Sequence, residues 1–315
     1  MYLIKAKPED FMVVEQSDLK LQDSGIYRYY GLDKRDLSTM EAVAAIAEKL
    51  NISTKFINIG GNKDKTALTR QTISIKGGPK HGMSIGKLSL TYLGAGDERM
   101  ALGMLTGNRF EITVRRLQSG AEERRTIPNY FDDQRFGITK NNHLIGKHII
   151  RREFEGACRL IGLATEDPIA KLASIEPRML RLYVHAYQSY LFNKLLCMRI
   201  EKSGDHDLID YALGKLLFPR KDVVSDEELS LPGFGTEGAD DILKEEGLTS
   251  RDFIIRQLPG LSAEGVMRKA FVGIQELKLS ELEDDEMHPG FKKQTVKFSL
   301  PKGSYATIVI KSLFR

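Results

Sequence analysis

The sequence is poor in the residues and patterns that mark several large protein classes. Its 315 residues include only two cysteines, Cys158 and Cys197, and no tryptophan. Two cysteines so far apart argue against a disulfide framework or a cysteine-rich zinc site, so we expect a reduced protein in the cytoplasm. No stretch approaches the roughly 20 consecutive apolar residues of a membrane-spanning helix, and MYLIKAKPEDF has no signal-peptide pattern. We therefore expect no membrane association.

Three familiar catalytic signatures are also missing. The six histidines are scattered, and none forms a His-x-x-x-His or His-Glu-x-x-His pair that could hold a metal. No Gly-x-Ser-x-Gly elbow marks a serine hydrolase, and no Gly-x-Gly-x-x-Gly follows a strand as in dinucleotide-binding enzymes. The sequence thus gives no support for a metal site, a nicotinamide cofactor or a serine nucleophile.

The composition is that of a globular protein with a slight excess of basic residues. Apolar residues make up 41% of the chain, charged residues 29%, and the net charge is +4. Acidic residues gather in EEGLTSRD and SELEDDE, whereas basic doublets stand elsewhere, at 115–116, 124–125, 151–152 and 292–293. This segregation is compatible with a basic groove for phosphates, although a solvated surface is the plainer interpretation.

The first third of the chain is typical of strands around one helix. Ser38 and Glu41 form a capping box, in which a hydroxyl and a carboxylate satisfy free amides at a helix start. Apolar residues at helical spacing behind it predict a helix that ends near Asn51. The segment NRFEITVRRL alternates apolar and polar residues, as a strand with one wet face does.

From about residue 126 the pattern becomes helical, chiefly from Pro177 to about Ile200. Shorter helices are predicted at 240–246 and 263–271, and the tail from residue 294 returns to a strand-rich texture. We therefore predict an α+β protein in which a helix-rich domain, 126–273, is inserted into a discontinuous domain of 1–125 and 274–315.

The segment GGNKDK, residues 60–65, is the most informative short stretch. It lacks the Gly-Lys-Ser/Thr of a phosphate-binding loop, and Asp64 follows Lys63 without the spacer of the guanine-binding Asn-Lys-x-Asp signature. Asp64 on this bend is an ordinary turn residue or a nucleophile. Two flanking lysines would favour its ionised form, and Gly60 and Gly61 would permit the close approach of a bulky ligand.

Five segments, read in order, resemble the TruD family of tRNA pseudouridine synthases in its archaeal type. They are KAKPEDFMVVE, GGNKDKTALTRQ, LGMLTGNRFEITVR, PNYFDDQRFG and LPKGSYATIVIKSLF, with a weaker match at HAYQSYLFN. They span nearly the whole chain. Asp132 stands where the family usually has glycine. The resemblance implies the pseudouridine synthase fold, a mixed, largely antiparallel sheet with flanking helices, and an inserted TRUD domain.

The resemblance also implies an isomerase that converts a tRNA uridine, by family precedent uridine 13, into pseudouridine without a cofactor or a metal. Asp64 takes the place of the catalytic aspartate, and Phe11, Asn108 and Tyr305 fall on substrate-contacting positions. Phe110 lines the same pocket in this interpretation. The expected partner is tRNA, and we expect a monomer.

The energetics of base flipping suggest a role for these residues but leave alternatives open. A uridine flipped out of folded RNA loses stacking that aromatic rings restore, at about 1–3 kcal/mol per base. Lys5 and Lys63 are the candidates to pair with the carboxylate. The plainer roles are core packing for both phenylalanines, a hairpin turn at Asn108 and a helix start at Tyr305. A catalytically silent RNA-binding or RNA-folding protein is the alternative function.

Overall fold

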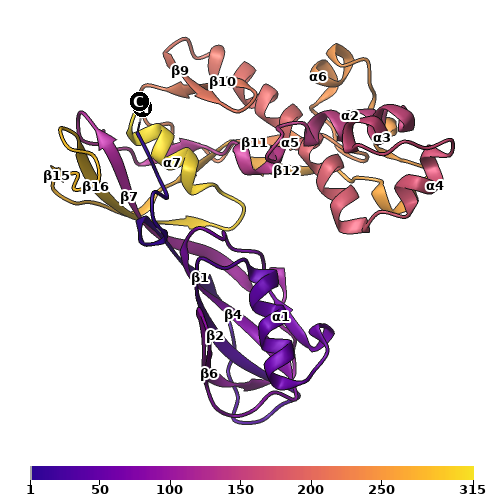
Figure 1. Cartoon of the computed structure of the whole chain (residues 1–315). Coiled ribbons are helices and arrows are strands. Elements are labelled where there is room, and N and C mark those ends of the chain that lie inside the picture. Colours follow the sequence, from indigo (N-terminus) through magenta and orange to yellow (C-terminus); the bar gives the residue numbers. More distant parts are fainter. Residues whose placement is uncertain (1) are drawn as a thin grey trace. The chain divides into compact units, whose positions relative to one another are not determined.

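The computed structural model describes residues 2–315, and the chain forms two compact units (Figure 1). The first unit comprises 2–123, 274–303 and residue 314. The second comprises 124–273, 304–313 and residue 315. Within residues 2–315, no helix combines the length and the apolar character needed to cross a membrane.

One ten-stranded sheet forms the first unit, in the order β14-β16-β7-β1-β4-β2-β6-β5, with β15 beside β16 and β3 beside β4. Among the described residues, every pair in it is antiparallel except β1 with β4. The strands are β1 (Phe11–Ser17), β2 (Tyr27–Arg35), β3 (Ile57–Ile59), β4 (Leu68–Lys76), β5 (Met83–Ile85), β6 (Leu88–Gly96), β7 (Leu105–Leu117), β14 (Gln275–Leu279), β15 (Glu283–Asp284) and β16 (Lys292–Pro301). The predicted mixed, largely antiparallel sheet is confirmed.

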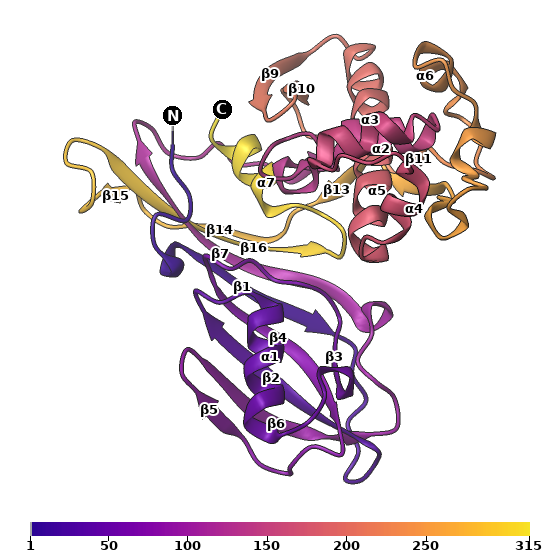
Figure 2. The ribbon, with the colours of Figure 1, turned by 45° about the vertical axis from the view of Figure 1, so that its right-hand side comes forward.

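Helix α1 (Thr39–Leu50) covers one face of this sheet (Figure 2). Both hydrogen bonds of the capping box between Ser38 and Glu41 are present, and Asn51 ends the helix in the left-handed conformation. The predicted helix is therefore confirmed. The buried core between helix and sheet consists mainly of Tyr30, Leu32, Val43, Ile46, Ile73 and Ile75. Short 3-10 turns complete the unit at Pro8–Asp10, Thr54–Phe56 and Leu102–Met104.

The second unit is rich in helices and is organised around α5, which begins at Pro177 as predicted. Leu180, Val184 and Leu191 of this helix are buried in a core that α2 and α3 share. The helices are α2 (Asn142–Ile150), α3 (Phe154–Ile161), α4 (Pro168–Ala173), α5 (Pro177–Glu201), α6 (Asp240–Glu245) and α7 (Ala306–Leu313), with 3-10 turns at Asp133–Phe136, Ser250–Phe253 and Pro259–Leu261.

Three two-stranded ladders complete the second unit. They join β8 (Thr126–Pro128) to β13 (Phe271–Gly273), β9 (His206–Tyr211) to β10 (Gly214–Pro219), and β11 (Glu228–Leu231) to β12 (Val266–Lys269). The helix predicted at 263–271 is wrong, because pairing with β11 and β8 overrides its local helical spacing. The strand-rich tail likewise ends at β16, and the rest of the tail forms α7.

The compact units differ from the predicted domains in one segment. The chain passes between units at 123/124 and 273/274, close to the expected boundaries, but Ser304–Leu313 packs with the helical unit. The assignment of catalysis to one domain and of RNA contacts to the other remains a prediction.

Candidate active site

The parallel pair of β1 and β4 brings the two most informative segments of the sequence to one edge of the sheet. Met12 pairs with Leu68, and both strands run in the same direction from there. The segments that precede them therefore leave the sheet at the same edge. Lys5 lies in one of these segments and Asp64 in the other.

Lys5 and Asp64 form an ion pair at this edge. Lys5 Nζ donates to Asp64 Oδ2 at 2.7 Å, and the two side chains are 20% and 31% exposed. The same ammonium lies 4.1 Å from the centre of the Phe11 ring, within cation–π range. The backbone of Lys5 has a φ of 60°, a left-handed conformation that costs a residue with a Cβ about 1–3 kcal/mol and is typical of functional positions.

The loop that carries Asp64 is anchored by polar side chains beneath it. The Lys63 backbone N–H donates to Thr39 Oγ1 at 2.9 Å, and the Thr39 hydroxyl donates to Gln71 Oε1 at 3.0 Å. The Gln71 amide then donates to the Gly61 carbonyl at 3.1 Å. Because Thr39 and Gln71 are buried on α1 and β4, the loop is held at a defined place over the sheet.

Gly60 serves packing in the structure, a use that the sequence did not indicate. A Cβ at this position would lie 2.8 Å from the Leu105 side chain, closer than real contacts allow. A Cβ at Gly61 would meet the same side chain at an ordinary 3.8 Å. The first glycine therefore lets the loop lie against β7.

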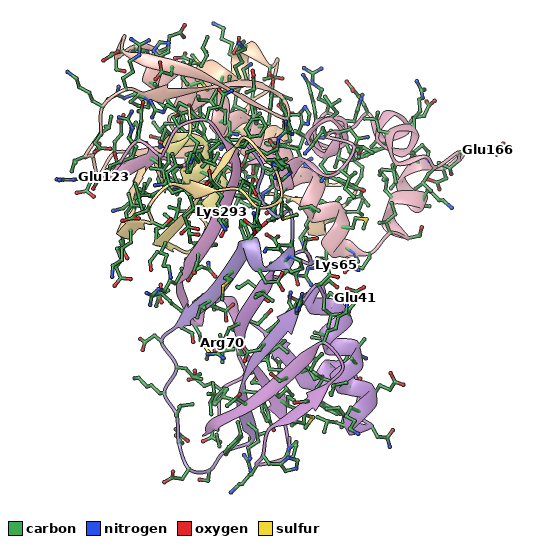
Figure 3. All side chains as sticks on the ribbon, turned by 60° about the vertical axis from the view of Figure 1, so that its left-hand side comes forward. Glu41, Lys65, Arg70, Glu123, Glu166 and Lys293 are labelled. Atoms are coloured by element: carbon green, nitrogen blue, oxygen red, sulfur yellow. The ribbon has the colours of Figure 1, made fainter. Side chains whose placement is uncertain are left out.

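The two lysines that flank Asp64 bind other carboxylates. Lys63 Nζ donates to Glu15 Oε2 at 2.5 Å, and these side chains are only 9% and 0% exposed. Lys65 pairs with Glu41 of α1 at 2.9 Å on the protein surface (Figure 3). Of the two candidate partners for the carboxylate, Lys63 is thus committed to Glu15, and the other candidate makes the ion pair.

Lys34 is a site residue that sequence reasoning missed. Its side chain is buried, and its Nζ donates to the carbonyl oxygens of Leu37 at 2.5 Å and Asp64 at 2.8 Å. Burial lowers its pKa to about 8, against an opposing attraction to the Asp64 carboxylate. The available signal was strand alternation, because Lys34 follows the inward-facing Tyr30 and Leu32 at the same spacing.

Phe11 and Phe110 belong to a row of buried rings on the face of the sheet that α1 covers. Their centroids are 6.4 Å apart in an edge contact, and Phe110 stacks on Phe298 at 5.3 Å. Both predicted rings are therefore core residues, 3% and 7% exposed. A contact of either ring with substrate stays a prediction.

Asn108 lies in the middle of β7, opposite Glu15 of β1 and Leu300 of β16. The hairpin turn considered for it is therefore wrong. Its side-chain oxygen is buried and accepts no hydrogen bond from any residue that the structure describes. Buried polar atoms are almost always paired, so this oxygen is an exception, and its contact with substrate stays a prediction.

Tyr305 belongs to the second unit, where it precedes α7. Its carbonyl accepts the Ile308 N–H at 3.1 Å, so it begins the helix as one interpretation expected. Its ring meets Phe131 edge-on, with centroids 6.0 Å apart. The neighbouring Ser304 hydroxyl donates to Asn129 Oδ1 at 3.2 Å. A substrate contact at Tyr305 stays a prediction.

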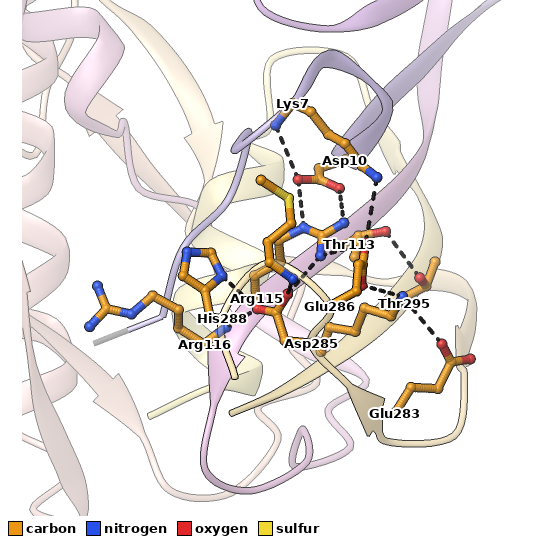
Figure 4. A network of polar contacts seen from close by, with 12 residues as sticks. Lys7, Asp10, Thr113, Arg115, Arg116, Glu283, Asp285, Glu286, His288 and Thr295 are labelled. Atoms are coloured by element: carbon orange, nitrogen blue, oxygen red, sulfur yellow. Dashed lines mark hydrogen bonds and ion pairs between the residues drawn. The ribbon is translucent and has the colours of Figure 1, made fainter. Parts of the chain in front are cut away.

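A buried arginine, Arg115, holds the segment that contains Lys5 at two points, of which Figure 4 shows the contact with Asp10. The backbone of Arg115 exchanges two hydrogen bonds with Leu3, at 2.8 and 2.9 Å. Its guanidinium donates two hydrogen bonds of 2.9 Å to the Asp10 carboxylate and one of 2.8 Å to Asp285. Lys5 lies between these two points, so Arg115 fixes both ends of the segment that carries it.

The second carboxylate of this network, Asp285, is held ionised by its donors. Burial would raise its pKa, but hydrogen bonds from the backbone N–H groups of Arg116 and Met287, from His288 and from Arg115 lower it well below its usual range. Because Arg115 faces three carboxylates, those of Asp10, Asp285 and Glu286, and is 2% exposed, the network is a fixed structural unit rather than a solvated ion pair.

Within the described part of the chain, no three His, Cys, Asp or Glu side chains lie close enough together to hold a metal ion. The expectation that the chemistry needs neither metal nor cofactor remains a prediction. The first unit does contain a part-buried carboxylate with an ammonium 2.7 Å from it, a buried amide oxygen without a partner in the described residues, and a row of rings.

Comparison with known proteins identifies the family of this chain. The family model of tRNA pseudouridine synthase D (TruD) matches residues 2–171, 161–228 and 225–313. The chain belongs to the TruD family. A Nanoarchaeum equitans protein assigned as tRNA pseudouridine synthase D is 31% identical, over 99% of this chain and 98% of its own. The Aquifex aeolicus tRNA pseudouridine synthase D is 30% identical, over 99% and 97%.

A solved structure supports the same assignment at the level of the fold. The crystal structure of a Methanosarcina mazei protein assigned to TruD matches 99% of this chain and 93% of its own, with a TM-score of 0.69 and 27% identity. The predicted TruD resemblance and the pseudouridine synthase fold are therefore confirmed.

Proposed function

We propose that this TruD family member is a tRNA pseudouridine synthase that isomerises uridine 13 with Asp64 as its nucleophile. The curated relatives are named for tRNA pseudouridine synthesis, and the chain aligns with two of them over nearly its whole length. The substrate position and the aspartate mechanism are the finer parts of the proposal. It acts on tRNA in the cytoplasm, as a monomer.

The isomerisation needs a group that can break and remake a bond to the sugar. The Asp64 carboxylate attacks either C1′ of the ribose or C6 of the uracil, and the N1–C1′ bond breaks. The base turns within the pocket, a C5–C1′ bond forms, and the bond from Asp64 to C1′ or C6 breaks, which releases the carboxylate. The C5 proton is lost while N1 gains one, so that atoms balance. The Lys5 ammonium, 2.7 Å from the carboxylate, holds Asp64 in position through this sequence.

The remaining predicted residues bind the flipped uridine. The Asn108 side-chain oxygen is an acceptor that suits the N3–H of uracil, and it has no partner in the described residues. Phe11 and Phe110 supply the apolar wall behind the ion pair, and Tyr305 supplies a ring that stacks on the base. Stacking offsets the cost of flipping, which is a few kcal/mol.

The observation that carries the proposal is the ion pair of Lys5 and Asp64, set over the Phe11 ring by a strained backbone. The test is to incubate purified protein with a tRNA transcript and to map pseudouridine by carbodiimide modification and primer extension. Wild-type protein should give one stop at position 13, and Asp64→Asn should give none. Asp33→Asn, which removes a carboxylate paired with Arg70 on the surface, is the matched control.

Three outcomes separate the parts of the proposal. Pseudouridine formed by Asp64→Asn at the wild-type rate would refute the aspartate mechanism. Pseudouridine at another position would refute the assignment of uridine 13 alone. Tight tRNA binding by the wild type with no pseudouridine at any position would favour the RNA-binding alternative over an enzyme.

A further inference from the structure

The second unit contains a pair of arginines on one aromatic ring. The guanidinium carbon of Arg268, on β12, lies 4.2 Å from the centre of the Phe131 ring, and that of Arg135 lies 5.3 Å from it. The Tyr305 ring meets Phe131 edge-on. Two cations and the predicted substrate ring thus share one phenylalanine.

This arrangement rests on a rigid base formed by two asparagines. Arg268 Nη2 donates to Asn129 Oδ1 at 2.7 Å and to the Asn129 carbonyl at 2.9 Å. Asn193 of α5 brackets the backbone of Phe131, accepting its N–H at 2.9 Å and donating to its carbonyl at 2.8 Å. Both asparagines are buried. The motifs NYFDDQRFG and HAYQSYLFN, to which no chemistry was assigned, therefore meet here.

Positive charge at this place is not balanced by the acidic residues nearest in sequence. Lys311 binds both of these, at 2.5 Å from Asp132 Oδ1 and 3.6 Å from Asp133 Oδ1. Arg135 forms no ion pair with any residue in the described part of the chain, and its buried Nε has no hydrogen-bond partner there. Its guanidinium is therefore available to an anion.

The effects on neighbouring groups agree with an excess of positive charge. Burial lowers the pKa of Arg268 to about 10, and the proximity of Arg135 lowers it further against an opposing influence of Tyr305. The charge of Arg135 thus disfavours a second cation beside it, as expected where positive charge is in excess.

We propose that Arg135, which contacts Phe131 together with Arg268 and next to Tyr305, binds a phosphodiester of the RNA strand close to the target uridine. The proposal rests on the proposed function, because it takes Tyr305 as a ring that contacts the base. Guanidinium groups bind phosphate oxygens through paired N–H donors. Phosphate contacts fix register without reading sequence, so this site positions the strand from which the uridine is flipped.

Binding measured without catalysis tests the site directly. The dissociation constant of a fluorescent tRNA transcript is measured by anisotropy against salt for wild type, Arg135→Gln and Arg159→Gln. Arg159 is an exposed arginine of the same unit, paired only with Glu155 among the described residues, and it serves as the matched control. We expect Arg135→Gln to weaken binding about 5–10-fold at ~0.1 M salt and to reduce the slope of log K against log salt by about 0.7–0.9, with no change in the control.

A second measurement identifies the phosphate. Methylphosphonates, which carry no charge, replace one at a time the phosphates within two nucleotides of the target uridine. One replacement should weaken wild-type binding by the same factor as Arg135→Gln, and should cost that variant nothing further. Arg135→Lys keeps the charge without the paired donors, so it should retain the salt slope and lose part of the affinity.

The proposal is overturned if Arg135→Gln has the wild-type affinity and slope, or if no replaced phosphate weakens wild-type binding. If Arg135→Gln does not fold, Arg135→Lys and the methylphosphonate series on wild-type protein decide the question. Because none of these measurements needs turnover, absence of pseudouridine would refute the proposed function and leave this result standing.

Discussion

Lys5 Nζ lies 2.7 Å from Asp64 Oδ2 and 4.1 Å from the centre of the Phe11 ring, so that one ammonium contacts both the carboxylate and an aromatic ring. The two residues are far apart in the sequence and meet only because β1 and β4 are parallel. Lys5 adopts a left-handed backbone to reach this place. Because this backbone conformation is unfavourable, its presence indicates that the position of the ammonium is more important here than local backbone stability.

Lys5→Met should reduce the rate of the chemical step far more than RNA binding. The variant keeps much of the packing on Phe11 but removes the charge that holds Asp64. We expect kcat to fall about 100-fold, as when one preorganised donor is removed. The dissociation constant for tRNA should stay within about twofold. Single-turnover pseudouridine formation and anisotropy measure the two effects.

Lys65→Met is the control for Lys5→Met, because Lys65 also flanks the site but pairs with Glu41 at the surface. Its kcat should equal that of the wild type. A Lys5→Met enzyme as fast as this control would exclude an electrostatic role for Lys5.

Local sequence patterns predicted the elements but not the partners of the site residues. The predicted capping box at Ser38 and the helix start at Pro177 are confirmed. Both features depend on short-range hydrogen bonds or on proline geometry, so local sequence is enough to predict them. The choice between Lys5 and Lys63 depended instead on strand order and register. No pattern within the loop could supply either.

Two buried charges of the first unit were overlooked although strand alternation points to them. Glu15 follows Phe11 and Val13 at inward positions of β1, and Lys34 has the corresponding place on β2. A charged residue at an inward position was the available signal. The role of each charge could be recognised only with its partner in the structure. The helix predicted at 263–271 failed for a related reason, because ladder pairing decided that segment.

Breaking the buried pair of Lys63 and Glu15 should destabilise the first unit without acting on the chemistry. Lys63→Met leaves Glu15, whose side chain is 0% exposed, without its cation. We expect a loss of about 3–5 kcal/mol in the free energy of unfolding by urea. The double variant Lys63→Met with Glu15→Gln should recover much of this loss. A double variant as unstable as the single one would show that the charge imbalance is not the cause.

Asp10→Asn should reduce activity by loosening the segment that carries Lys5. The substitution weakens the two hydrogen bonds from Arg115 to Asp10 and removes no side chain that contacts the Asp64 carboxylate. We expect kcat to fall about tenfold, because small displacements of a catalytic group are costly. Glu9→Gln is the matched control, since Glu9 pairs with Arg35 at the surface.

A double-variant cycle separates positioning from general damage. If Asp10 acts through Lys5, then Asp10→Asn should cost little further activity once Lys5 is methionine. If the two losses multiply in the double variant, Asp10 does not act through Lys5. Thermal unfolding of all the variants shows whether stability follows a separate pattern.

His143 should make the second unit less stable in mild acid. It lies between Phe136 and Tyr190, is 8% exposed, and its Nδ1 has no hydrogen-bond partner within the described residues. Burial, reinforced by repulsion from Lys147, lowers its pKa to about 4 from an ordinary 6.5. Between pH 6.5 and 4 the unfolded chain therefore binds a proton that the folded chain does not, and stability falls as the pH falls.

We expect this difference to cost about 1–3 kcal/mol between pH 7 and pH 4.5, read from urea unfolding at each pH. His143→Phe keeps a ring between Phe136 and Tyr190 but cannot titrate, so its stability should fall by that much less over the same range. His81→Asn, at an exposed loop position, controls for the loss of any histidine. Equal pH dependence in wild type and His143→Phe would show that the buried imidazole does not control acid stability.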